Sequence, residues 1–232
     1  MKIKSLFYPP ILNVEERKIV TKKVKLPDGT VKEVEGHHHE NGGGFVAETA
    51  KVSKTVYVGN GAMVLENAVV KGNVKIEDEA IVAGGTIEGE VVIKDKARVY
   101  GNPYLGEKAE VSGNAHVFGS AHVTGNAKIT GNAWVFDRAH ISGNAWIGGN
   151  ANVSGDVKIK DNARIGSYAE IGGKMVIGGD VEIYHGEVIG KAALTSKKAL
   201  EIFFESQKKL EEELKRLEGE SKEQEGKNEK RR

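Results

Sequence analysis

The chain has 232 residues, with 34 Lys and Arg against 33 Asp and Glu, and no cysteine. A charge this close to balance gives no reason to expect a nucleic-acid partner, and disulfide or thiol chemistry is excluded. No stretch is apolar enough to cross a membrane, and the first residues lack the apolar core of a signal peptide. Lys and Glu are abundant at both ends, which is in keeping with a thermophilic source.

Residues 1–45 carry no repeat and form the first predicted region, an arm followed by a β-hairpin. Lys18–Leu26 and Thr30–Val34 are rich in β-forming residues and flank Pro27-Asp28-Gly29, a turn sequence, which predicts the hairpin. The apolar segment Leu6–Leu12 precedes it. This segment either caps the first repeat or is an arm that docks onto another protein.

The densest group of metal-ligating side chains is His37, His38, His39 and Glu40. Consecutive residues of an extended loop point in different directions, so at most two of them could share one ion. Gly42–Gly44 follow and mark a close turn of the backbone. We favour a polar entry loop here, and His37 and His39 are the candidates if a metal is bound.

A six-residue period runs from about residue 46 to residue 190. From Val111 the units read VSGNAH, VFGSAH, VTGNAK and ITGNAW. A large aliphatic residue opens each unit, Asn follows Gly or Asp, and a small residue, usually Ala, comes fifth. A fixed short repeat stacks one supersecondary unit many times, which predicts a solenoid. Period six and the recurrent Gly and Asn exclude a helix.

The opening residues are predicted to point into the core of short strands, and their neighbours to point outward. We expect Asn at the corner to take a positive φ, which it tolerates better than most residues. The opening residues follow a register with one unit of five residues, after Ile76. They are Val46, Val52, Val58, Val64, Val70, Ile76, Ile81, Ile87, Ile93, Val99 and Leu105, then the units from Val111, and finally Ile171, Ile177, Ile183 and Ile189.

This pattern resembles the hexapeptide-repeat superfamily over residues 46–190. The resemblance implies a left-handed parallel β-helix with three units in each 18-residue coil, about eight coils, and a homotrimer. The superfamily includes acyltransferases, γ-class carbonic anhydrases and purely structural proteins, so the scaffold alone does not give the activity. The GNAxV form of the units is most similar to non-enzymatic phage and prophage repeat proteins.

Aromatic residues recur at the coil period just after inward-pointing valines. With 18 residues in a coil they form a ladder on one face, with three further large side chains on the other side of the same strands. Contiguous apolar patches of this kind mark interfaces, although stacking that merely stabilises neighbouring coils would give the same spacing. The ladder is Tyr100, Phe118 and Phe136, and the flanking residues are Arg98, His116 and Trp134.

Three histidines, His116, His122 and His140, occupy outward positions directly before an aliphatic residue. His122 and His140 are one coil apart and are expected to stack; they are further candidates for metal binding. The resemblance to γ-class carbonic anhydrases stops there, because the acidic and Gln companions are missing. The repeats also run on without the loop that carries the catalytic His of the acyltransferases. We therefore expect no catalytic residue, no metal and no cofactor.

Residues 191–218 form the last structured region, with a helix over 194–218. Thr195 or Ser196 can cap its first turn. Core positions then follow at the three-four spacing of a coiled coil. They are Leu200, Phe203, Gln207, Leu210, Leu214 and Leu217. The helix either packs on its own β-helix or mediates self-association, and the charged residues 219–232 are expected to be disordered.

Together these features predict a non-enzymatic structural protein, a homotrimer of β-helices. The prophage resemblance places it in a virion, as a capsid decoration protein or tail appendage, with a capsid or tail protein as its further partner. An extracellular or cell-surface structural module is the first alternative. An enzyme similar to the hexapeptide acyltransferases or γ-class carbonic anhydrases is the second.

Overall fold

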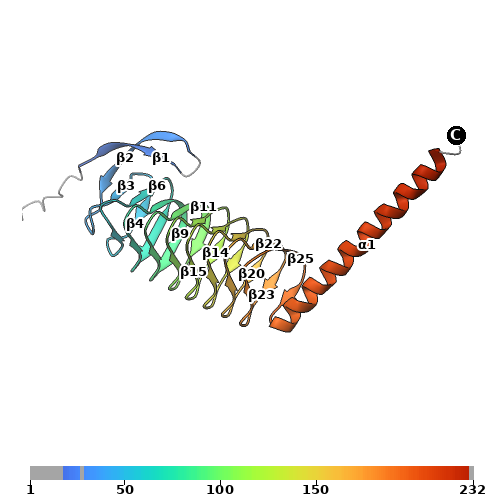
Figure 1. Ribbon diagram of the computed structural model, residues 1–232. Helices are drawn as coiled ribbons and strands as arrows, with labels where there is room; N and C mark the ends of the chain where they lie inside the picture. Colours follow the sequence, from blue (N-terminus) through green and yellow to red (C-terminus); the bar gives the residue numbers. More distant parts are fainter. Residues whose placement is uncertain (1–17, 27–28, 230–232) are drawn as a thin grey trace, which may run out of the picture.

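The structure is a computed structural model that describes residues 18–26 and 29–229. Its body is a parallel β-solenoid of about eight turns. A β-hairpin lies over one end of the solenoid and one long helix projects from the other end (Figure 1). The predicted repeat, the hairpin and the C-terminal helix are therefore all present.

Three faces, named A, B and C, make up the solenoid. Face A contains β3 (Phe45–Ala47), β6 (Met63–Leu65), β13 (His116–Val117), β16 (Trp134–Val135), β19 (Asn152–Val153), β22 (Glu170–Gly173) and β25 (Glu187–Gly190). Face B contains β4 (Lys51–Val52), β7 (Val69–Gly72), β14 (His122–Val123), β17 (His140–Ile141), β20 (Lys158–Ile159), β23 (Val176–Ile177) and β26 (Ala193–Leu194).

Face C contains β5 (Tyr57–Val58), β8 (Lys75–Ile76), β10 (Val92–Ile93), β12 (Glu110–Val111), β15 (Lys128–Ile129), β18 (Trp146–Ile147), β21 (Arg164–Ile165) and β24 (Glu182–Ile183). Two longer strands, β9 (Ile81–Gly89) and β11 (Arg98–Leu105), continue across the corner from face A to face B. Within each face, strands one coil apart pair in parallel.

The core is a column of the residues that open the units, with the small residues between them. Val111, Val117 and Val123 are each fully buried, as predicted, and Ala115 and Ala121 fill the narrow spaces near the corners. Burying apolar side chains stabilises by about 25 cal/mol for each Å² removed from water. A large aliphatic residue and a smaller apolar one, repeated from unit to unit, thus build a continuous core.

The corners differ from the prediction in which residue has the positive φ. It is the Gly or Asp before the Asn, for example Gly125 with φ of 70° and Asp161 with φ of 61°. The Asn side chains instead donate to one another from coil to coil, as Asn126 does to Asn144 at 3.0 Å. Where Asp replaces Gly, its carboxylate accepts a backbone N–H of the next coil, as Asp161 does from Gly179 at 3.0 Å.

The predicted register is wrong by one residue at Ile81. Val82 points into the core, while Ile81 is buried in a separate cluster outside face A. The short unit therefore lies between Val82 and Ile87, not after Ile76. Gly84 and Gly85, with φ of 109° and 80°, let β9 turn the corner with one residue fewer.

A second short unit, which the sequence did not predict, lies near the end of the solenoid. Val188 is fully buried, whereas Ile189, expected to point inward, is 51% exposed. Strand β25 pairs Val188 with Ile171, so the shift begins before Glu187. Gly186, with φ of 83°, lies in the shortened corner.

The predicted hairpin is confirmed as β1 (Val20–Lys25) paired with β2 (Val31–His38). Strand β2 also pairs with β3, and the hairpin then folds over the outside of face A. Val24 and Leu26 pack there against Phe45, Leu65 and Ile81. Pro27 and Asp28 of the predicted turn, and the arm Leu6–Leu12, lie outside the described residues.

The C-terminal helix, α1, extends from Lys197 to Glu229 and so runs past residue 218, where we expected a tail without regular structure. Ser196 caps it, because its Oγ accepts the N–H of Ala199 at 3.2 Å. Leu200 and Phe203 pack against the last coil, and the rest of α1 points away from the solenoid (Figure 1). No helix formed by the described residues is long and apolar enough to span a membrane.

Candidate functional site

The aromatic ladder predicted from the coil period is present on the outer side of face A. The ring of Phe118 stacks on Tyr100 and on Phe136, with centroids 4.8 Å apart in both pairs and ring planes within 3° of parallel. The parallel pairing of β11, β13 and β16 sets this spacing. All three side chains are half-buried.

The three flanking side chains lie beside the ladder, as predicted. His116 stacks on Trp134 with centroids 5.1 Å apart, and Trp134 meets Phe118 edge to face at 5.8 Å. Arg98 lies one coil before His116 in the same register. Trp134 remains 47% exposed. We call these six residues the face A strip.

The electrostatics of the face A strip favour uncharged rings. Burial and the charge of Arg98 lower the pKa of His116, so its imidazole is held neutral at lower pH than usual. Burial likewise raises the pKa of the Tyr100 hydroxyl. Desolvation also lowers the pKa of Arg98, whose charge still lies beside these rings. The strip is therefore an apolar surface with a cation at one end.

The hairpin occupies the part of face A that precedes this strip. Phe45, Leu65 and Ile81 hold the outward positions in the first coils and lie beneath it, and Tyr100 touches the edge of the same cluster. The outer surface of face A is thus apolar through successive coils, and the described residues of the hairpin cover its beginning. Sequence reasoning missed this cover, although large apolar residues in outward positions were a signal for it.

The second predicted stack, His122 on His140, lies on face B rather than beside the strip. The imidazole centroids are 4.8 Å apart, and Tyr104 continues the column at 5.5 Å from His122. His140 Nδ1 lies 2.8 Å from the carbonyl of Arg138. Burial and the charge of His140 lower the pKa of His122. A corner of the solenoid therefore separates these two side chains from His116, which lies on face A.

The histidines of the entry loop have different partners. His37 Nδ1 lies 2.7 Å from a carboxylate oxygen of Glu48, and His38 Nδ1 lies 2.7 Å from the carbonyl of Gly43. His39 is buried and its Nδ1 faces Asn41. Within residues 18–26 and 29–229, no three His, Asp or Glu side chains gather as metal ligands would.

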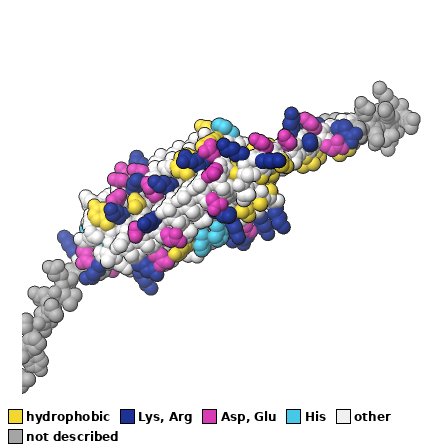
Figure 2. Space-filling view, turned by 90° about the horizontal axis from the view of Figure 1, so that it is seen from below, with side chains coloured by type: hydrophobic (Ala, Val, Ile, Leu, Met, Phe, Trp, Pro, Cys, Tyr) yellow, Lys and Arg dark blue, Asp and Glu magenta, His cyan; other side chains and the backbone are white. Residues whose placement is uncertain are grey.

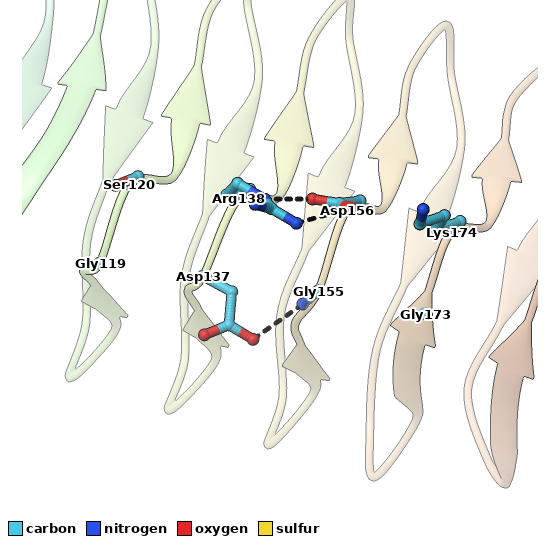
Figure 3. A pocket seen from close by; sticks show the side chains of 8 residues that line it. All are labelled: Gly119, Ser120, Asp137, Arg138, Gly155, Asp156, Gly173 and Lys174. Atoms are coloured by element: carbon cyan, nitrogen blue, oxygen red, sulfur yellow. Dashed lines mark hydrogen bonds and ion pairs between the residues drawn. The ribbon is translucent and has the colours of Figure 1, made fainter.

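A shallow groove of about 570 Å³ follows the corner between faces A and B (Figure 3). Arg138 and Asp156 form a two-point ion pair across it, with Nη2 and Oδ2 2.8 Å apart. Hydrogen bonding from Arg138 lowers the pKa of Asp156. Asp137 accepts the N–H of Gly155 at 3.0 Å. The ion pair and the hydrogen bond of Asp137 each join neighbouring coils, so the residues of this groove stabilise the corner.

The predicted coiled-coil seam of α1 is divided in two. Leu200 and Phe203 cover the last coil, so they act within the chain. Leu210, Leu214 and Leu217 are 56%, 51% and 48% exposed and lie on the projecting part. Hydrophobic side chains follow one side of this projecting helix (Figure 2). The exposed half of the seam is a second apolar surface.

Residues 138–173 match a family model described as bacterial transferase hexapeptide (six repeats). Together with the β-solenoid, this match supports placement in the hexapeptide-repeat superfamily. No curated protein and no solved structure was found to match the chain. The superfamily contains both enzymes and non-enzymes, so the match gives the scaffold and not the activity.

Proposed function

We propose that this protein is a non-enzymatic structural β-solenoid that assembles into a homotrimer. The ladder of coplanar rings on the outside of face A supports this proposal most directly. Aromatic residues and Arg are enriched at protein interfaces, and the strip presents both on one face. The leucines at the projecting end of α1 add a second surface at the three-four spacing of a coiled coil.

The finer proposal is a virion role, as a capsid decoration protein or tail appendage with a capsid or tail protein as further partner. A rod with one covered end and one helical extension is suited to a fixed position in a larger assembly. Immunogold labelling of virions with antibodies to this chain tests the assignment. Labelling of the cell surface instead supports the extracellular structural module.

Sedimentation of the double variant Phe118→Ala/Phe136→Ala tests the self-association. Interface hot spots cost about 2 kcal/mol or more on truncation, so the variant is expected to dissociate at concentrations where the wild type is trimeric. The β-sheet signal should persist, because the buried Val and Ala column is unchanged. Tyr168→Ala, at a 70% exposed aromatic residue outside the strip, is the matched control.

Two results would contradict the structural proposal. If the double variant keeps the mass of the wild type, the ladder only stacks neighbouring coils. If the purified protein holds about one zinc per chain, and also hydrates CO₂ or transfers acyl groups with loss of that activity in His116→Ala, the chain is an enzyme.

A further inference from the structure

In the part of the chain that the structure describes, the outer edge of β1 in the hairpin has no strand beside it. Among the described residues β1 pairs with β2 alone, in an antiparallel register from Val20 with Gly36 to Lys25 with Val31. Leu26 donates its N–H to the carbonyl of Thr30 at 2.8 Å. Hydrogen-bonded pairs alternate in such a ladder, so the N–H and C=O groups of Thr21, Lys23 and Lys25 face away from β2.

A groove of about 440 Å³ runs beside this free edge. Five consecutive residues, from Lys22 to Leu26, form one wall, which shows that the groove meets the edge of the strand and not one of its faces. Met63 and Ile81 of face A form an apolar floor, and Arg98 and His116 close the far side. The groove thus combines backbone groups with an apolar surface.

The charges around the groove are predominantly positive. Lys22 lies 5.7 Å from the ring centroid of Phe45, and neither it nor Lys25 has an ion-pair partner among the described residues. Lys23 lies 3.6 Å from Glu33 in an exposed pair. Glu79 is the acidic residue whose charge reaches Arg98. The groove therefore favours an anionic occupant.

Arg98 is held in place with part of its guanidinium unused. Nη1 donates to the carbonyls of Glu79, Lys96 and Ala97, at 2.8, 2.9 and 3.2 Å. Nε and Nη2 have no acceptor among the described residues. A guanidinium fixed on one side by these three backbone carbonyls and open on its other side can bind a carboxylate with two parallel hydrogen bonds.

We propose that the free edge of β1 and this groove bind an extended acidic peptide by strand addition. Alternate residues of an added strand would point down onto Met63 and up beside Lys23 and Lys25. The occupant is therefore a segment in which apolar and acidic residues alternate, with one carboxylate on Arg98. This site goes beyond the proposed assembly, because it uses the hairpin edge with the Arg98 and His116 end of the face A strip, and not the stacked rings of Tyr100, Phe118 and Phe136.

The first test uses an eight-residue peptide of alternating valine and glutamate, labelled with a fluorophore, and the full-length protein. We expect saturable binding by fluorescence anisotropy at pH 7. A valine–lysine peptide and a fully N-methylated valine–glutamate peptide should bind at least about tenfold more weakly. The proposal is overturned if the N-methylated peptide binds as well, because strand addition requires its N–H groups.

Variants of the protein locate the site. Arg98→Gln should weaken peptide binding by about tenfold, and Arg164→Gln, on face C, should leave it unchanged. Phe118→Ala/Phe136→Ala should still bind the peptide at concentrations where its trimer dissociates. The proposals of self-association and of peptide binding can therefore fail independently. If the peptide binds only after deletion of residues 1–17, the groove belongs to the chain's own N-terminal segment and the proposal is wrong.

Discussion

Individual glycines decide how closely successive coils can approach. Gly84 has φ of 109°, and a Cβ placed there would lie 2.3 Å from the carbonyl oxygen of Gly101. Both partners in that contact are backbone, so neither can move aside without shifting a strand. Gly43 also has a positive φ, 77°, but no heavy atom lies within 4 Å of its ideal Cβ. Comparing Gly84 with Gly43 therefore separates the cost of a strained backbone from the cost of a steric clash with a new Cβ.

We therefore expect Gly84→Ala to cost more than Gly43→Ala. The second substitution carries only the strain of a left-handed conformation, about 1–2 kcal/mol. The first adds a collision with backbone and should exceed about 3 kcal/mol in the free energy of unfolding. Urea denaturation of both variants measures the difference. Equal losses would show that the corner at Gly84 can relax.

The two histidines with lowered pKa values should make stability depend on pH. Burial is the first cause for both; the charge of Arg98 adds to it at His116, and that of His140 at His122. The unfolded chain takes up protons near the ordinary pKa of about 6.5 before the folded chain does. Stability is therefore greatest above that pH and falls as the pH is lowered through it, until the lowered folded pKa is passed.

Thermal unfolding between pH 7.5 and 5 tests this expectation. The melting temperature of the wild type should fall over this range, and that of His116→Gln/His122→Gln should fall less. The carboxyls with lowered pKa values, such as Glu110 and Asp156, lose their contribution only near and below their ordinary pKa of about 4. Identical slopes for the two proteins would show that these imidazoles do not matter.

Residue positions were predictable where the period is undisturbed. The stacking of Phe118 between Tyr100 and Phe136 follows from the coil length alone. The inward residue of the third coil did not follow, because Ile81 and Val82 are adjacent and equally suited to a core. The hairpin, which buries Ile81 from outside, resolves the choice. No local pattern contains that information, since the hairpin residues are distant in sequence.

At the scale of single elements, α1 has two parts, one packed on the last coil and one exposed, that its sequence presents as one seam. The three-four spacing from Leu200 to Leu217 predicted a single seam. In the structure its first turns close the end of the solenoid and its later turns extend away. The seam could not be divided from the sequence, because both surfaces require leucine or phenylalanine at the same spacing.

Substitutions on α1 should distinguish the part packed on the last coil from the projecting part. The triple variant Leu210→Gln/Leu214→Gln/Leu217→Gln leaves the first turns of α1 packed on the last coil. It should lower the stability of the trimer without changing the fold of the solenoid. Phe203→Ala removes a side chain packed on the last coil and should lower the melting temperature by the loss of core contacts. Sedimentation and thermal unfolding distinguish the two effects. If the leucine variant assembles as the wild type does, the projecting helix has no part in association.

At the scale of the whole molecule, the repeat alone predicted the solenoid and its approximate number of coils. Each coil contacts only its neighbours, so the coil period propagates from end to end without long-range information. The places where the period is broken were not all predictable, because a repeat unit with Gly at its corner can have either five or six residues.

Deletions of different length should test this coil geometry. Removing Ala145–Asn162 deletes one complete coil and should give a folded, shorter rod in which α1 keeps its face relative to the ladder. Removing Ala145–Asn150 deletes one unit and moves every later strand to the next face. Both variants should keep the β-sheet signal, and only the second should lose trimer stability. Loss of folding in both would show that the coils are not interchangeable.

The two five-residue units have a consequence that concerns folding errors. A chain of identical units could close its coils in several frames, each displaced from the native one by a whole coil, with nearly the same contacts. The shortened corners at Gly84-Gly85 and at Gly186 restrict this choice, because each matches the strands of the adjacent coils in one alignment only. A misaligned stack would turn Ile81 and Ile189 toward the core in place of Val82 and Val188, each at its own end of the rod. The irregular units thus mark the start and the end of the rod, and they make a repetitive sequence encode a single alignment.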